Sequence, residues 1–115
     1  MWSKIFQDPV PDLYGDLLLA MDGKPTDAAT LDGGWMNVQG YDKISVHVII
    51  PTTGTVQICG SNEHIDGASG PDNDGYQLFP DITSSQIVSI KTPLKWLKAK
   101  VTANGGQIQA PFIAV

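Results

Sequence analysis

The sequence predicts an all-β protein, an antiparallel two-sheet sandwich of about eight strands with a jelly-roll-like order. Three observations support this prediction. The apolar segments are short, and several of them alternate with a period of two, which is the spacing of a half-buried strand. The 12 glycines and 8 prolines fall between these segments rather than in one linker. No segment has convincing helical periodicity, and an immunoglobulin-like sandwich is the second choice.

Two strands are expected in the first third of the chain. The run 16–21 is short and apolar with a glycine on each side, which favours a buried strand over a helix. A polar, glycine-rich connection covers 22–34, and 35–39 is typical of a strand. We expect residues 1–13 to form an N-terminal arm, and residues 14–115 to form a single β-sandwich domain.

The clearest alternation lies in 43–50, where four aliphatic side chains point to one face: Ile44, Val46, Val48 and Ile50. The following segment 51–54 contains proline and glycine, and it predicts a hairpin into a return strand over 55–59. These two strands are therefore expected to be antiparallel neighbours. Cys59 faces away from the inward residues of its strand and is expected to pack as a small hydrophobic residue.

The longest loop is expected over 60–75, where turn-forming residues dominate. Short strands follow over 76–79 and 85–91. In the second of them Ile87 and Val88 are adjacent, so the alternation leaves open which of the two points inward.

The last third predicts two strands. In 94–103, four apolar residues on one face alternate with a tryptophan, two lysines and a threonine on the other; the apolar residues are Leu97, Ala99, Val101 and Ala103. Asn104-Gly105-Gly106 tolerates the positive φ of a tight hairpin. The closing strand lies within 107–115, where Pro111 indicates an edge position or a bulge.

Length and charge exclude several classes of protein. A chain of 115 residues forms one domain, and no apolar run reaches the roughly 18 residues of a membrane helix. The net charge is −5, and all seven basic residues are lysines, so nucleic-acid binding is not expected. The first ten residues lack the pattern of a signal peptide, and we expect the product to stay in the cell that makes it or to leave by lysis rather than secretion.

Metal and catalytic sites have little support in the sequence. Asp66, Asp72 and Asp74 are weak calcium candidates, because their spacing differs from that of an EF-hand and aspartate is common in any exposed turn. His47 and His64 are not spaced so as to converge on a metal or a nucleophile. We therefore expect no cofactor and no enzymatic activity.

Two segments are candidates for partner contacts. Four of the seven lysines lie in 91–100, where Trp96 shares one strand face with Lys98 and Lys100. This tryptophan either packs under the lysine stems, contacts an acidic partner or sister subunit, or stacks on a sugar. The apolar residues of the arm either cover its own sandwich or reach a neighbouring subunit; they include Trp2, Ile5 and Phe6.

Four stretches resemble a pattern in small tailed-phage virion proteins. They are GWMNV at 34–38, YDKISV at 41–46, GTVQICGSN at 54–62, and LKWLKAKVTA at 94–103 with the Asn-Gly-Gly turn after it. The resemblance implies a β-sandwich or jelly-roll subunit of the virion, most like head decoration (cement) proteins that clamp capsomers. It implies a subunit that is made in the host cytoplasm and located on the capsid surface. There it binds the major capsid protein, often as a homotrimer.

The resemblance carries over no catalytic residue. A different class of function remains open beside it, a carbohydrate- or receptor-binding β-sandwich module of a phage tail or fibre. Such a module would stack a sugar on Tyr76 or Trp96 and would use the aspartate-rich loop as a calcium site.

Overall fold

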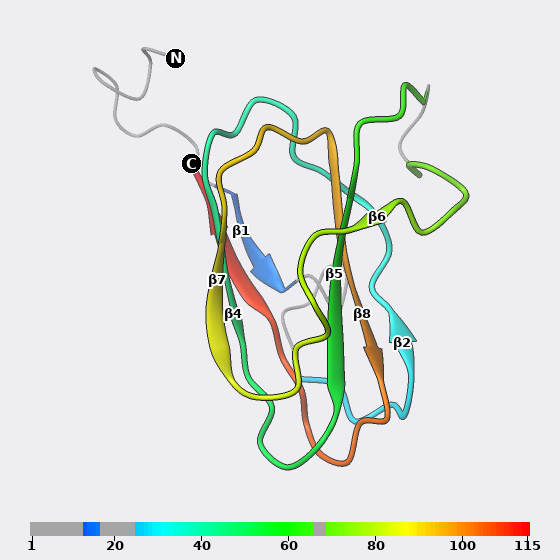
Figure 1. The fold of residues 1–115 in the computed structure, drawn as a ribbon, viewed down its shortest axis with the longest axis vertical. Helices are drawn as coiled ribbons and strands as arrows, with labels where there is room; N and C mark the ends of the chain where they lie inside the picture. Colours follow the sequence, from blue (N-terminus) through cyan, green and yellow to red (C-terminus); the bar gives the residue numbers. More distant parts are fainter. Residues whose placement is uncertain (1–12, 17–24, 66–68) are drawn as a thin grey trace.

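The chain forms two antiparallel β-sheets packed face to face (Figure 1). The computed structural model describes residues 25–65 and 69–115, together with the backbone of residues 13–16. The described strands are β1 (Leu13–Asp16), β2 (Leu31–Asp32), β3 (Met36–Asn37), β4 (Ile44–Val48), β5 (Thr55–Ser61), β6 (Tyr76–Gln77), β7 (Gln86–Ile90), β8 (Trp96–Thr102) and β9 (Pro111–Ala114).

The strand order confirms the all-β sandwich and is that of a jelly roll. One sheet has the order β1-β9-β4-β7, and the other has the order β2-β8-β5-β6, with β3 also paired to β8. Because β2 and β3 pair with successive parts of β8, they act as one interrupted strand. Counting them as one gives eight strands in the orders 1-8-3-6 and 2-7-4-5, with neighbours along the chain mostly in opposite sheets.

The alternation seen in the sequence determines the core. In β4 the even-numbered residues Ile44, Val46 and Val48 are buried, and the residues between them are exposed. Strand β8 likewise buries Leu97, Ala99 and Val101 inside the sandwich. The prediction for Ala103 is wrong, because the strand ends at Thr102 and Ala103 is exposed with a φ of 54°. The ambiguity in β7 is resolved, since Val88 lies in the core and Ile87 is exposed. The side chains between the sheets therefore come from every second position of each long strand.

Both predicted hairpins are wrong. Strand β4 pairs with β7 and β9, whereas β5 pairs with β6 and β8, so the segment 51–54 crosses from one sheet to the other. The turn at 104–106 likewise connects β8 to β9 in the opposite sheet. Both strands at each turn have an apolar face, and a crossover lets each bury that face against the other sheet. The two crossovers meet at one end of the sandwich, where Gly105 N donates to Thr53 O at 3.0 Å.

Two further expectations need correction. Pro111 lies at neither an edge nor a bulge: it is the first residue of β9, which is flanked by β1 and β4. A first position tolerates a residue that has no N–H to donate. The first strand covers Leu13–Asp16 rather than the predicted 16–21, and residues 17–21 lie outside the described part of the chain.

Candidate functional site

A β-bulge shapes the outer face of the five-stranded sheet. Asp32 is opposite Lys100 and Met36 is opposite Leu97, so three residues, 33–35, face only two on β8. Gly34 in this bulge has a φ of 80°, which favours glycine. The extra residue places Trp35 over the outer face of the sheet, since bulges commonly redirect a side chain.

Lys98 is the centre of a charged cluster on this face. Its ammonium group lies 3.1 Å from Asp32 Oδ2 and 2.9 Å from Asp74 Oδ1. Asp74 Oδ2 lies 2.8 Å from the Lys100 ammonium. Lys98 Nζ also lies 4.7 Å from the centre of the Trp35 ring, within the range of a cation–π contact. Although Lys98 is only 4% exposed, its charge is therefore balanced on several sides.

These contacts shift the pKa values of the cluster. The hydrogen bonds from Lys100 and Lys98 lower the pKa of Asp74 to about 2. Burial lowers the pKa of Lys98, but its bonds to Asp74 and Asp32 outweigh that effect and raise the pKa above its usual value. Burial likewise raises the pKa of Cys59, which lies opposite Lys98 on β5. These pKa shifts keep Asp74 and Lys98 ionised and the Cys59 thiol protonated at neutral pH.

The segment 69–75 contacts this face and holds the aromatic rings. The Trp35 indole N–H donates to Asn73 O at 3.2 Å, and Asn73 Nδ2 donates to Glu63 Oε1 at the same distance. A Cβ on Gly70 would lie 2.6 Å from Trp35 Cβ, and one on Gly75 would lie 2.8 Å from the far edge of the ring. The segment thus packs directly on Trp35 at two positions where only glycine fits.

The structure covers most of the face predicted to bind a partner. Trp96 is 1% exposed, and its indole N–H donates to Glu63 O at 3.2 Å. Of the three predicted contact residues on β8, Trp96 and Lys98 are buried, and Lys100 is partly exposed, with 26% of its side chain accessible. The ring of Trp96 therefore has no open side on which a sugar could stack, whereas Tyr76 is 73% exposed at the edge of the same sheet. The covering of Trp96 by this chain itself is one of the arrangements considered from the sequence.

The other predicted site residues are distributed as follows. The arm residues Trp2, Ile5 and Phe6 and the weak calcium candidate Asp66 lie outside the described part of the chain. Asp72 is exposed, and the carboxylate oxygens of Asp74 are held by two ammonium groups. Among residues 25–65 and 69–115, no group of three or more histidine, cysteine, aspartate or glutamate side chains is placed to hold a metal ion.

The outer face of the four-stranded sheet differs, because exposed aliphatic side chains lie on it. Ile87 is 63% exposed and Ile113 is 48% exposed. Ser45 lies between Ile113 and Ser89 across three strands, and His47 lies opposite Ile87. We call these five residues the bare face. A shallow groove of about 270 Å³ lies at one end of it, bordered by two lysines.

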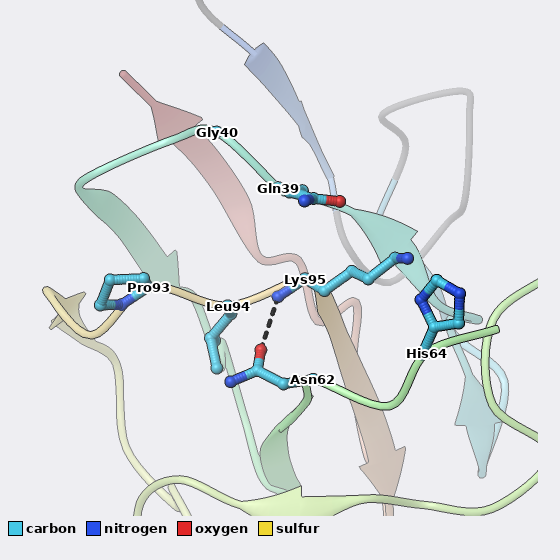
Figure 2. A pocket seen from close by; sticks show the side chains of 7 residues that line it. All are labelled: Gln39, Gly40, Asn62, His64, Pro93, Leu94 and Lys95. Carbon is cyan, nitrogen blue, oxygen red and sulfur yellow. Dashed lines mark hydrogen bonds between the residues drawn. The ribbon is translucent and has the colours of Figure 1, made fainter. Parts of the chain in front are cut away.

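A second concavity lies at the end of the sandwich opposite the two crossovers, and we call it the loop-end cleft (Figures 1 and 2). It measures about 370 Å³ and is formed by three connecting segments. Its described lining residues are Gln39, Gly40, Asn62, His64, Pro93, Leu94 and Lys95. In Figure 2 the side chains of Gln39, His64 and Lys95 extend toward one side of the cleft.

Several residues of these sites were not identified from the sequence. Trp35 and Asp32 belong to the charged cluster, and Gln39 and Asn62 line the loop-end cleft. The Gly33-Gly34-Trp35 run was a usable signal, since adjacent glycines in a strand pattern indicate a bulge. Gln39 and Asn62 gave no such signal in the sequence, because asparagine and glutamine are common in any loop.

Comparisons with known proteins leave the family open. No protein-family model matches the chain, and no curated protein or solved structure matches it either. Within the described residues, no helix is long and apolar enough to cross a membrane.

Proposed function

We propose that this chain is a structural virion protein, a capsid decoration (cement) subunit that binds the outer capsid surface as a homotrimer and stabilises the head. The four sequence stretches quoted above resemble small tailed-phage virion proteins. The jelly-roll order is one that viral capsid domains use, although lectins and other proteins use it too. Because a fold alone is compatible with many functions, the argument depends on a surface of this molecule.

The observation that supports the proposal best is the bare face. It contains two isoleucines that are about half exposed or more, and its five residues include no lysine, aspartate or glutamate. Exposed apolar side chains on a charge-depleted patch are typical of the centre of a protein contact. Trp96 and Lys98 are used within the subunit, so the proposed contact lies on the sheet opposite to the one expected from the sequence.

The size of this face favours a repeated partner. The bare face spans three strands at about 4.8 Å spacing and about three residues at about 3.3 Å along each strand, which gives roughly 150 Å². A stable free complex buries about 800 Å² on each partner. A contact of this size is weak for one subunit, but it is reinforced when linked copies bind a regular lattice. The proposed partner is therefore the shell of major capsid proteins.

The N-terminal arm is the second proposed contact. Its residues Trp2, Ile5 and Phe6 lie outside the described part of the chain, but the arm joins β1, which is the edge strand of the sheet that carries the bare face. A variant without residues 1–12 keeps the whole of β1. We expect it to remain folded and to lose capsid affinity.

The proposal is tested by co-sedimentation of the purified chain with capsids of the virus that encodes it. We expect the double variant Ile87→Ser, Ile113→Ser to bind at least about tenfold more weakly, because it removes both exposed apolar side chains. The matched control is Tyr76→Ser, which removes an equally exposed ring from the other sheet and should leave binding within twofold. Equal binding by all three proteins, or none by the unaltered chain, would overturn the proposal.

Light scattering on a sizing column tests the oligomeric state. A mass near three times 12.3 kDa supports the homotrimer. A monomer in solution that also binds capsids singly, without threefold clustering in electron micrographs, would contradict that part of the proposal.

A further inference from the structure

We propose that the loop-end cleft binds a uronic-acid residue, a saccharide unit that carries a carboxylate group. The cleft (Figure 2) shares no lining residue with the five residues of the bare face. The inference is therefore independent of the proposed capsid contact, and either can fail without the other.

The cleft is held open by hydrogen bonds between its three walls. Val38 N donates to Lys95 O at 2.8 Å, which joins the first wall to the third. Lys95 N donates to Asn62 Oδ1 at 2.8 Å, and Trp96 Nε1 donates to Glu63 O at 3.2 Å, which join the third wall to the second. A ligand therefore meets walls that are already in place, so little binding free energy is spent on ordering them.

The polar side chains of the cleft favour an anion. Lys95 carries an ammonium group, and Gln39 and Asn62 carry carboxamides. Because Asn62 Oδ1 accepts the Lys95 backbone N–H, the orientation of this amide is fixed, with Nδ2 as a donor. No described lining residue is an aspartate or glutamate, although the chain as a whole has a net charge of −5. The Lys95 ammonium lies 5.7 Å from the centre of the Trp96 ring, a contact that leaves its charge without a counter-ion among the described lining residues. Such a group is suited to a carboxylate of the ligand.

The rest of the lining favours a saccharide over a simple anion. Pro93 and Leu94 present C–H groups to the cleft, next to the amide and ammonium donors. A pyranose has the complementary character, with an apolar C–H face and a rim of hydroxyl groups. The volume of about 370 Å³ lies at the lower end of small-ligand pockets, which span about 300–1,000 Å³. We therefore assign one sugar residue to the cleft, with its carboxylate directed to Lys95.

Amide chemical shifts in ¹⁵N-labelled full-length protein test this site. D-Glucuronate should give saturable shifts centred on Gly40, Asn62 and Lys95, at constant ionic strength and neutral pH. D-Glucose should bind more weakly, since it lacks the carboxylate. Acetate should give no matching shifts, since it lacks the ring.

Two lysine variants separate the site from general charge effects. Lys95→Gln should weaken glucuronate binding by roughly tenfold, because a hydrogen bond to a charged group contributes on that order. Lys91→Gln makes the same charge change on an exposed lysine outside the lining and should bind like the unaltered protein. Gln39→Ala, an exposed position on the opposite wall, should weaken glucose and glucuronate alike and gives a second test if Lys95→Gln does not fold.

Three results would overturn the proposal. The first is the absence of saturable shifts with glucuronate. The second is equal loss of affinity in Lys95→Gln and Lys91→Gln, which would indicate attraction to net charge only. The third is an acetate response that reproduces the glucuronate pattern, which would indicate an adventitious anion rather than a saccharide.

Discussion

The two outer faces of the sandwich differ although both begin as alternating strands. On the five-stranded sheet, the segment 69–75 contacts the face, and Lys98 is paired with Asp32 and Asp74. On the four-stranded sheet, Ile87 and Ile113 remain exposed between serines. An amphipathic strand therefore does not determine what covers its outer side. A loop with a matching set of charges covers one face, whereas the other keeps two exposed isoleucines among the described residues.

Gly75→Ala should cause the largest loss of stability at the outer face of the five-stranded sheet, which residues 69–75 contact and which we call the covered face. The residue has a φ of 63°, and an added Cβ would lie 2.6 Å from Gly60 O and 2.8 Å from Trp35. Because the first of these atoms is backbone, the clash cannot be relieved by a rotamer change. We expect a loss of about 2–4 kcal/mol in the free energy of unfolding, measured by urea denaturation.

Gly40→Ala is the matched control for that variant. Gly40 also has a positive φ, 97°, but an added Cβ meets nothing within 4 Å. It should lose only about 1–2 kcal/mol, the cost of the backbone conformation itself. Equal losses in the two variants would show that the packing of 69–75 on Trp35 contributes nothing.

Removing the central ammonium should open the covered face. In Lys98→Met the side chain keeps most of its apolar stem, but Asp74 loses one of its two lysines and Trp35 loses the ammonium group over its ring. We expect a destabilisation of about 1–2 kcal/mol. Cys59, a buried free thiol opposite residue 98, should react faster with a thiol reagent at neutral pH.

Lys100→Met serves as the comparison, because it removes one ion pair from a more exposed lysine. Thiol reactivity in this variant should stay near that of the unaltered chain. If both variants leave Cys59 equally protected, the charged cluster does not hold the covering segment in place.

The sequence predicted which residues face the core far better than it predicted which segments touch. The alternation in 44–48 and 97–101 is local, so Val46 and Ala99 were assigned to the interior without knowing their partners. Strand pairing is not local. The segment 51–54 has the residues of a hairpin turn, yet β5 finds its partners 16 to 47 residues away, on β6 and β8.

The candidate sites show the same limit. Lys98 was correctly placed on an outer face, but its partners Asp74 and Asp32 are 24 and 66 residues distant in the sequence. No spacing rule connects them. The loop-end cleft was not predicted at all, because Gln39, Asn62 and Lys95 come together only after the three connections are folded.

Acid should weaken the covered face before any change is seen on the bare one. The folded pKa of Asp74, about 2, lies below its usual value of 3.8. A depressed acid pKa contributes stability that is complete above the usual value and is lost as the pH falls toward the folded one. Tryptophan emission should therefore shift to the red between about pH 4 and pH 2, and Asp74→Asn should remove this transition. An unchanged transition in Asp74→Asn would assign it to other carboxylates.

The smallest effect is expected on the bare face. Ile87 is 63% exposed, and Ile87→Thr keeps the β-branched shape that suits a strand while it replaces the ethyl group by a hydroxyl. Because little of this side chain is buried, the free energy of unfolding should change by no more than about 0.5 kcal/mol. The buried neighbour provides the contrast, since Val88→Thr places a hydroxyl in the core and should cost about 1–3 kcal/mol. A loss in Ile87→Thr as large as that in Val88→Thr would mean that Ile87 is packed in the free subunit. The bare face would then lack the free apolar side chain on which the proposed contact depends.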